Sequence, residues 1–513
     1  MGSDKDYLAA AMVQVLVLPD RFPFTIMDVS VLLVFIVTFV LAARFLKKVK
    51  NPGNLPPSAP GGWPLLHHLP TLFKRDFRLE LDKWARELGD VYHVNFVVIE
   101  MYVVSGYTAL REMMETDAFS TRLEGSASAI ADGDQDILMA PYGEVFKERR
   151  RFATSVLRRL GVKMGRGSIQ DQIQEEASSI CLKISKYSER PFDVSADLTT
   201  AVGNIICALV FGKRFDYGDT RFQHLQATMK NLGAELVKWK APFVTYIPKV
   251  QDPVAGLRFH AKKLQQFIRE EIGRHRLNLD PEDPRDFIDY CLLQLAQQDE
   301  GGTWLKEDNV VYIIQDLFIA GTDTTAATLT WALLYMVLYP DVQQKVQAEL
   351  DSVLGATKPS LAHRDQLPYT TATIMEAQRI RHIAPVLFLR QADESNSLRG
   401  FDIAKGTILF PNLRSVHMDP VAWPDPEVFD PSRFLDADGK VVNNLPSFLP
   451  FSAGRRNCLG EQLAKMELFL LFSTILQHFA LKLPEGAPTP STEGIFKSLS
   501  MAPAPFQLCA VSR

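Results

Sequence analysis

The chain has 513 residues, which is long enough for one large domain or for two to three small ones. Hydrophobic residues make up 47% of it and charged residues 23%, a balance that excludes a disordered chain and favours a globular protein. The net charge of −4 gives no bulk electrostatic argument for nucleic-acid binding.

The cysteines and histidines narrow the class of protein further. The five cysteines are odd in number, widely spaced and never arranged as C-x-x-C, which argues against a disulfide framework and for a reducing compartment. No H-E-x-x-H motif occurs, so we expect no zinc site.

The N-terminal part carries a candidate membrane segment. Residues 26–43 are almost continuously apolar, and at about 18 residues they are just long enough to span a bilayer. The basic cluster over residues 44–50 places the following chain in the cytosol and residues 1–25 in the lumen. A basic n-region and a cleavage site are both missing, which predicts a retained signal anchor; a buried core helix is the alternative. Residues 44–70 are basic and proline-rich and predict a linker to a domain over 71–513.

Hydrophobic periodicity predicts the first elements of that domain. We expect a helix over 77–88 and two strands over 91–97 and 100–105. Residues 116–140 lack periodicity and predict a long irregular loop, a kind of segment that is often functional. From residue 142 to about 298 the pattern is mostly helical.

A strongly basic stretch lies between residues 147 and 166. It holds eight basic side chains and a single acidic one, Glu148. The pattern indicates either a solvated helix face or a docking surface for an acidic partner.

Residues 310–339 predict a long apolar helix. From Leu317 to Tyr339 its only charged residue is Asp323, so a transmembrane helix and a buried core helix both fit. Five threonines, and an Asp-Thr pair beside a glycine in the middle, favour the core. Small residues there would let the helix pass close over a cofactor, and Thr324 and its neighbours could open the local helical hydrogen bonds. The hexapeptide over 320–325 is otherwise compatible with an ordinary helix N-cap.

Two charged motifs and one short strand follow. Glu376 and Arg379 lie three residues apart on one face of a predicted helix, which by itself indicates only a surface ion pair. Residues 385–390 predict a strand. The stretch Asp430-Pro-Ser-Arg433-Phe434 has the pattern P-x-R-F.

The last motif is the loop from Phe451 to Gly460, which leads without a break into a predicted helix. Its cysteine, Cys458, stands at the helix N-terminus, where free amides and the helix dipole favour a thiolate. The glycines allow close approach of a flat, bulky group, and Arg456 can pair with a carboxylate. Haem, which is planar, anionic and centred on a metal, has all the properties that these residues would bind. A buried structural cysteine is the alternative.

These motifs resemble those of the cytochrome P-450 family. Residues 451–460 match the haem-binding signature F-x-x-G-x-R-x-C-x-G at every fixed position, and residues 320–325 match A-G-x-D/E-T-T/S. The resemblance is closest to the animal microsomal family-2 group, first to long-chain fatty acid hydroxylases and next to vitamin D 25-hydroxylases. It implies a mainly α fold with a small β subdomain, preceded by one N-terminal transmembrane helix.

The resemblance also implies roles for individual residues. Cys458 would bind the iron of haem b, iron protoporphyrin IX, and Asp323 and Thr324 would handle oxygen and protons. The haem would further contact Phe146, Arg150, Ala320, Arg390, Phe451, Gly454, Arg456 and Gly460. Structural support would come from Glu376, Arg379 and Arg433. The substrate pocket would include Phe318, Val386, Phe388 and Phe496.

Three positions depart from the family pattern. Phe146 replaces a tryptophan and would lose one N–H donor to a haem propionate. Arg390 stands where a histidine is frequent and can bind a carboxylate at least as well. Leu389 replaces a proline, so the local backbone can differ.

The implied activity is monooxygenation of a lipophilic molecule by O2. Electrons would come from NADPH-cytochrome P-450 reductase, with cytochrome b5 as a second donor, at the cytosolic face of the endoplasmic reticulum membrane. A fatty acid is the first expected substrate, and a steroid or xenobiotic the second. A haem-thiolate isomerase, a haem sensor and a structural membrane protein without haem are the rival interpretations.

Overall fold

The computed structural model describes residues 53–63, 66–73, 77–97, 99–123, 136–162, 168–238, 255–297, 304–384, 389–496 and 500–513. The predicted anchor over 26–43 lies outside these residues. Within them, no helix combines the length and the apolar character needed to cross a membrane. Residues Pro56–Arg513 form one compact unit.

The larger unit is mainly helical. Its helices are η1 (Leu69–Phe73), α3 (Phe77–Leu88), α4 (Tyr107–Glu115), η2 (Asp117–Phe119), α5 (Glu144–Val162), α6 (Ile169–Ser185), α7 (Ser195–Phe211), α8 (Thr220–Lys238), α9 (Ala255–Leu277), α10 (Phe287–Gln297), α11 (Glu307–Leu338), α12 (Pro340–Leu354), η5 (Leu361–Gln366), α13 (Pro368–Ile380), α14 (Arg414–His417), η6 (Pro431–Phe434), η7 (Gly454–Arg456) and α15 (Glu461–His478). The predicted helices over 77–88, 310–339 and after residue 460 correspond to α3, α11 and α15.

The strands form one larger sheet and three small pairs. They are β1 (Val91–Asn95), β2 (Glu100–Val104), β3 (Thr121–Arg122), β4 (Arg390–Gln391), β5 (Asn396–Leu398), β6 (Phe401–Ile403), β7 (Ile408–Pro411), β8 (Phe479–Lys482), β9 (Gly494–Phe496), β10 (Met501–Pro503) and β11 (Cys509–Ser512). The large sheet has the order β1-β2-β7-β4-β3, and β9–β10, β8–β11 and β5–β6 pair separately. The predicted strands over 91–97 and 100–105 are confirmed as β1 and β2.

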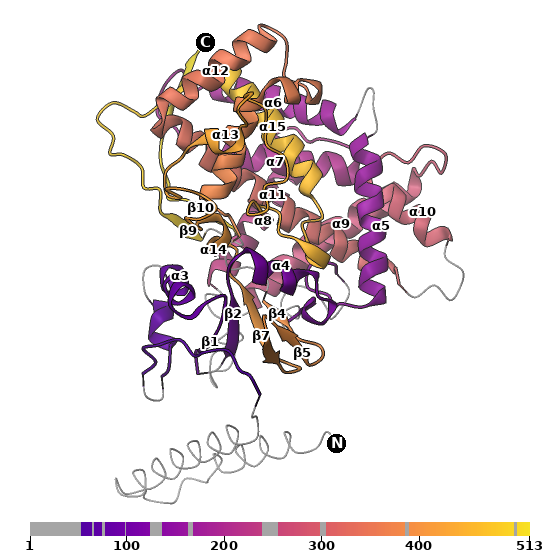
Figure 1. Ribbon diagram of the computed structural model, residues 1–513. Helices are drawn as coiled ribbons and strands as arrows, with labels where there is room; N and C mark the ends of the chain where they lie inside the picture. The colour runs from indigo at the N-terminus through magenta and orange to yellow at the C-terminus, as the bar shows by residue number, and fades with distance from the viewer. Residues whose placement is uncertain are drawn as a thin grey trace, which may run out of the picture. The chain divides into compact units, whose positions relative to one another are not determined.

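Helix α11 forms the axis of the helical part, with the sheet, α3 and α4 at one end of the unit (Figure 1). It packs against α7, α9, α13, α15 and β10. Most of its side chains are buried on every side, as expected for a helix that is apolar around its whole circumference. This position explains how a nearly uncharged stretch of membrane-spanning length can belong to a protein core.

Two predicted irregular segments contain more structure than expected. The loop over 116–140 begins with η2 and β3, and β3 pairs with β4. Within the predicted linker, Ser58 bridges to His93 of β1, and Ala59 is buried. These residues therefore pack against the sheet, because the extended backbone that prolines favour can pair with a strand edge.

Candidate active site

The cysteine loop, Phe451–Gly460, packs closely against α4. Gly454 has a φ of +69°, and a Cβ on it would lie 2.0 Å from the carbonyl oxygen of Met114. The backbone N–H of Cys458 donates to the carbonyl oxygen of Phe451 at 2.9 Å. The loop is thus closed on itself and held at a point where only glycine fits.

Arg456 connects this loop to the chain on both sides of β3. Its three guanidinium nitrogens donate to the carbonyl oxygens of Ser120, Ile137 and Ala140 at 2.9, 3.1 and 2.5 Å. The guanidinium also lies 3.6 Å from the ring centroid of Phe146, a cation–π contact. Phe146 therefore supports an arginine of the cysteine loop.

Four guanidinium groups gather beside the loop: those of Arg122, Arg150, Arg390 and Arg456. Arg122 and Arg390 face each other across the β3–β4 ladder, where like charges destabilise a sheet. Burial and the neighbouring guanidiniums lower the pKa of Arg390 to about 10 and that of Arg456 to about 9. The nearby acid is Asp136, and within the described chain the Nε of Arg390 has no hydrogen-bond partner. Such a cluster is suited to bind carboxylates.

Sequence reasoning missed Arg122 in this cluster. It is buried, and its Nε donates to the carbonyl oxygen of Leu138 at 3.0 Å. Its neighbours Arg390 and Arg456 also lower its pKa, after burial as the main cause. The available signal was a lone cation within the predicted irregular loop of residues 116–140, which matches no motif of the family.

The thiol of Cys458 is accessible to solvent, although protein atoms crowd the region around it. This crowding raises the pKa of the thiol to about 11, while the Gly460 N–H and the charges of Arg150 and Lys465 lower it. The lowering expected from the helix N-terminus is therefore present, but desolvation outweighs it. A coordinating metal deprotonates a thiol outright, so metal binding can supply the thiolate that the protein alone does not.

One stripe of α11 is less buried than the rest of the helix. Leu317, Ala320, Gly321 and Thr324 are half-buried, and their spacing of three and four residues puts them on one face. A Cβ on Gly321 would lie 2.7 Å from the Cδ1 of Ile206, so this glycine makes room for α7. The middle of α11 thus presents small and polar side chains along one face.

Asp323 and Thr324 make different contacts at this stripe. The Thr324 hydroxyl donates to the carbonyl oxygen of Ala320 at 2.6 Å, and the Asp323 carboxylate accepts a hydrogen bond from the Ser500 hydroxyl at 2.5 Å. Helix α11 is continuous from Glu307 to Leu338. The threonine bonds back to the preceding turn, and the opening of local helical hydrogen bonds that the sequence suggested stays a prediction.

The comparisons with known proteins agree with this arrangement. The family model for cytochrome P450 matches residues 56–510. The chain belongs to the cytochrome P450 family. It is 37% identical to cytochrome P450 2U1 of Homo sapiens over 481 residues, which is 92% of this chain and 85% of that protein. It is 36% identical to cytochrome P450 2J3 of Rattus norvegicus over 95% of this chain and 97% of that protein. It is 38% identical to cytochrome P450 2D6 of Pan paniscus over 90% of this chain and 93% of that protein.

This P450 is therefore a monooxygenase with a haem-thiolate cofactor, which uses O2, a substrate and a redox partner. The residues present fit haem. Its two propionate carboxylates suit the buried guanidinium cluster, whose pKa values are lowered first by burial and then by the repulsion between neighbouring guanidiniums. The thiol of Cys458 is accessible and belongs to a residue type that can bind haem iron.

Glu376 and Arg379 form a buried ion pair behind the loop. Two nitrogens of Arg379 bind the two carboxylate oxygens of Glu376 at 2.6 and 2.7 Å, and the Nε of Arg433 lies 3.5 Å from the same carboxylate. Arg379 also donates to the carbonyl oxygen of His417 at 2.9 Å, and the Nε2 of His417 accepts from the N–H of Leu449 at 2.8 Å. The pair thus connects α13 to the chain two residues before the cysteine loop.

The predicted pocket residues differ in how deeply they are buried. Phe318 is buried and stacks on Phe211 of α7, with ring centroids 5.3 Å apart, so it belongs to the helical core. Phe496 on β9 is 39% exposed, and the Arg78 guanidinium lies 6.0 Å from its ring centroid. Val386 and Phe388 lie outside the described residues.

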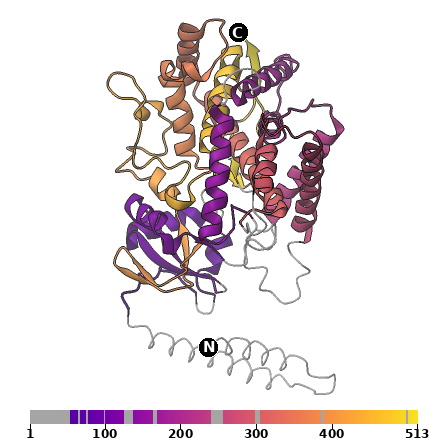
Figure 2. The ribbon, with the colours of Figure 1, turned by 90° about the vertical axis from the view of Figure 1, so that its right-hand side faces the viewer.

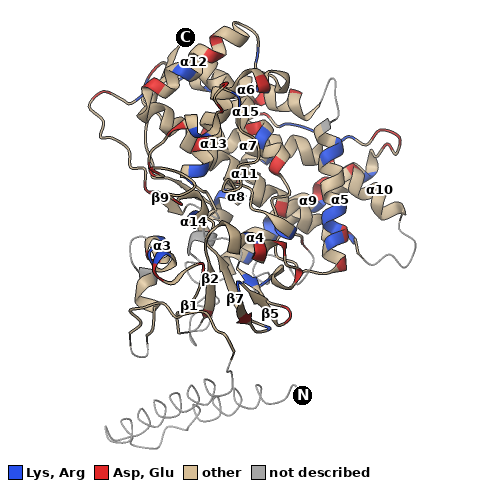
Figure 3. Cartoon of the chain, viewed as in Figure 1, with Lys and Arg blue, Asp and Glu red and all other residues tan. Residues whose placement is uncertain are grey.

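The basic stretch of 147–166 lies mostly on α5, which runs along one side of the unit (Figure 2) and has several positions coloured blue for Lys or Arg (Figure 3). Arg151, Arg158 and Arg159 are exposed and line surface hollows beside the helix. Arg149 is buried and donates to a backbone carbonyl at 2.7 Å, so it is not part of this surface. The members Lys163 and Arg166 lie outside the described residues.

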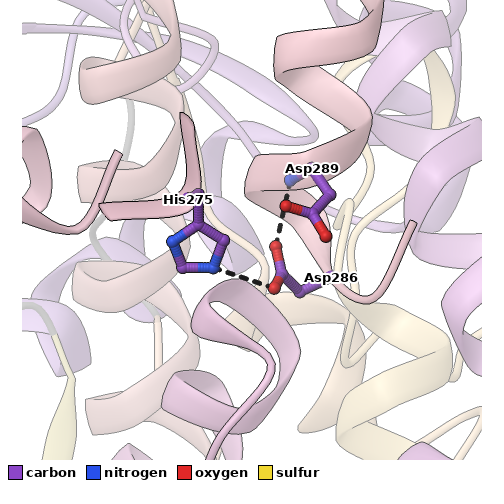
Figure 4. Close-up of side chains that lie close together, drawn as sticks. All are labelled: His275, Asp286 and Asp289. Carbon is purple, nitrogen blue, oxygen red and sulfur yellow. Dashed lines mark hydrogen bonds and ion pairs between the residues drawn. The ribbon is translucent and has the colours of Figure 1, made fainter. Parts of the chain in front are cut away.

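A second buried group consists of residue types that can bind a metal ion: His275, Asp286 and Asp289 (Figure 4). Its atoms already have protein partners. His275 Nε2 lies 2.9 Å from an oxygen of Asp286, whose other oxygen accepts the Asp289 N–H at 3.0 Å. Arg285 binds both carboxylate oxygens of Asp289 at 2.7 and 3.0 Å. The group therefore acts as an internal ion-pair network that joins α9 to α10.

Proposed function

We propose that this P450 inserts one oxygen atom into a C–H bond of a long-chain fatty acid. The observation that carries the site assignment is the combination of an accessible thiol with four largely buried guanidiniums at one loop. The fatty acid rests on the resemblance of residues 317–325 and 460–467 to fatty acid hydroxylases.

We assign the following roles. The Cys458 thiolate binds the iron, and Arg122, Arg150, Arg390 and Arg456 neutralise the propionates. When bound, the haem supplies oxygen activation, which a thiolate ligand favours by electron donation. Thr324 places its hydroxyl on the half-buried stripe, where it can bind oxygen or water while its proton bonds to Ala320. Asp323, one residue earlier, delivers protons through water.

The electrons come from a membrane-bound NADPH-cytochrome P450 reductase, with cytochrome b5 as a second donor at the same face. The exposed cations Arg151, Arg158 and Arg159 of α5 support this assignment, because charge steering by a basic face raises the association rate with acidic partners. Residues 26–43 would anchor the enzyme in the endoplasmic reticulum membrane, with the catalytic unit on the cytosolic side.

The first test is the absorption spectrum of the reduced, carbon monoxide-bound protein, measured beside Cys458→Ala. We expect a strongly red-shifted Soret band from the wild type and none from the variant. A histidine-like band from the wild type, or an unchanged band from the variant, would remove Cys458 as the ligand.

The second test addresses the substrate. We expect a long-chain fatty acid to shift the Soret band of the oxidised protein and to give a hydroxylated product with NADPH and reductase. Turnover of steroids or xenobiotics, with fatty acids neither bound nor oxidised, would contradict the proposed substrate and leave the monooxygenase in place.

A further inference from the structure

The carboxylate of Asp323 is held by a residue far away in the chain. Its Oδ2 accepts a hydrogen bond from the Ser500 hydroxyl at 2.5 Å, across a sequence separation of 177 residues. Ser500 is completely buried, directly before β10. A donor to one carboxylate oxygen restricts the rotation of the group and therefore fixes the direction of the other oxygen.

The backbone beside Ser500 is fixed to the core at two points. The N–H of Met501 donates to the carbonyl oxygen of Ile383 at 2.7 Å. The Nε1 of Trp331 donates to the carbonyl oxygen of Met501 at 2.9 Å. Trp331 is a fully buried residue of α11, about two turns after Asp323. The Ser500 hydroxyl is thus held in a constant place relative to the helix whose carboxylate it binds.

The same segment reaches a predicted wall of the substrate pocket. Met501 pairs with Phe496 in the antiparallel β9–β10 ladder. Phe496 is half-exposed, whereas Ser500, on the neighbouring strand segment, is not exposed at all. One short piece of chain therefore connects a pocket residue with the carboxylate that we assign to proton delivery.

We propose that Ser500 is a positioning residue for Asp323, which sets the direction of its carboxylate and links proton delivery to the β9–β10 wall of the pocket. This inference rests on the proposed role of Asp323. Proton transfer requires heavy atoms within hydrogen-bonding distance, and a displacement of about 1 Å can cost up to a hundredfold in rate. Loss of the Ser500 hydroxyl should therefore reduce product formation while haem and substrate binding persist.

The test compares Ser500→Ala and Ser500→Thr in the full-length, haem-loaded enzyme with NADPH and reductase. For Ser500→Ala we expect an unchanged carbon monoxide spectrum and unchanged KM. We also expect several-fold less product per NADPH, more hydrogen peroxide and a larger solvent isotope effect on kcat. Ser500→Thr, which keeps the hydroxyl, should restore coupling. Wild-type coupling in Ser500→Ala would overturn the proposal.

Ser473→Ala is the matched control. Ser473 is also completely buried, but its hydroxyl has no hydrogen-bond partner in the described structure, so this variant removes the same atom without removing a bond to a carboxylate. We expect wild-type coupling from it. A loss of coupling as large as that of Ser500→Ala would contradict the specific role of Ser500.

Two further variants separate the inference from the proposed function. If Asp323→Asn leaves coupling unchanged, the role of Asp323 itself is wrong. If Asp323→Asn is impaired, Ser500→Ala should add nothing to it in the double variant, and a fully additive loss would contradict the positioning role. Should Ser500→Ala fail to load haem, Ser500→Cys keeps the volume with a weaker donor. Intermediate coupling in that variant supports the proposal, and wild-type coupling overturns it.

Discussion

The two functional regions of this P450, the cysteine loop and the middle of α11, are held in different ways. Many separate contacts fix the loop, including the Gly454 packing, three hydrogen bonds of Arg456 and the Glu376–Arg379 pair acting through His417. At the middle of α11, the Thr324 hydroxyl bonds to the preceding turn, and the Asp323 carboxylate accepts a hydrogen bond from Ser500. We infer that the metal ligand is placed by a rigid frame of many contacts, whereas oxygen and proton handling involve individual side chains on one face of α11.

The largest effect is expected where the cysteine loop packs most closely, at the contact between Gly454 and α4. Gly454→Ala would put a Cβ 2.0 Å from a carbonyl oxygen at a φ of +69°, so either the loop or α4 must move. We expect almost complete loss of haem incorporation, measured as the carbon monoxide-difference signal per mole of protein.

Gly439→Ala is the control for backbone strain alone. Gly439 has a φ of +74°, and no atom lies within 4 Å of the place where its Cβ would be. We expect near-normal haem content, with a stability loss of about 1 kcal/mol. Equal haem loss in both variants would show that the contact with α4 does not decide the loop geometry.

The second effect concerns the middle of α11, where a substitution should impair product formation and leave haem binding by the cysteine loop intact. Thr324→Ala should keep the haem spectrum but lower product per NADPH by about tenfold, because one hydrogen-bonding group at the proposed reaction site is removed. Hydrogen peroxide formation measures the diverted electrons.

Thr330→Ala tests whether this effect belongs to position 324. Thr330 makes the same bond to the preceding turn, from its hydroxyl to the carbonyl oxygen of Ala326 at 2.7 Å, but it is buried on another face of α11. We expect coupling close to wild type. An equal loss in both variants would assign the effect to helix stability.

A third, smaller effect concerns the packing between the two regions. Glu467 of α15 is buried, bonds to Thr325 of α11, and has a carboxyl pKa raised from 4.5 to about 8 by desolvation. Between these two pH values the native chain binds a proton that the unfolded chain has lost, so stability falls as pH rises through this window.

Glu467→Gln removes the titration because glutamine stays neutral. At about 1.4 kcal/mol per pKa unit, the variant should gain a few kcal/mol relative to wild type above pH 8, seen as a higher thermal midpoint, and little below pH 5. Glu485→Gln, at an exposed carboxylate, should leave the pH dependence unchanged. Parallel curves for Glu467→Gln and wild type would show that Glu467 is already charged in the native protein.

The comparison also shows which parts of the site a sequence can reveal. The cysteine loop and the Asp-Thr pair were predictable because their chemistry lies in residue types at fixed local spacing. Ser500 and His417 were not predictable, because their partners come from distant parts of the chain that only the tertiary fold brings together. The same holds for Arg122 opposite Arg390.

Helix faces were a second limit of the sequence. Helix α11 is apolar around its circumference, so periodicity cannot tell which residues line a site and which face neighbouring helices. This explains why Phe318 was predicted in the pocket but packs on Phe211, while the adjacent Leu317 lies on the less buried stripe. Fold class, by contrast, was implied by the resemblance of the cysteine loop and of residues 320–325 to the cytochrome P-450 family.

The smallest expected effect tests Phe146, where the sequence departs from the family's tryptophan. Its ring stacks on the Arg456 guanidinium at 3.6 Å, and such contacts contribute about 0.5–2 kcal/mol. Phe146→Leu should therefore speed haem loss by up to about tenfold, measured by transfer to a haem acceptor, since Arg456 would lose its stacking partner. Phe146→Trp keeps the stacking and adds an N–H donor, so haem loss should be slower than in wild type. If leucine and phenylalanine retain haem equally, Arg456 is held by its three carbonyl partners alone, and the cysteine loop is even more redundantly fixed than the comparison with α11 implies.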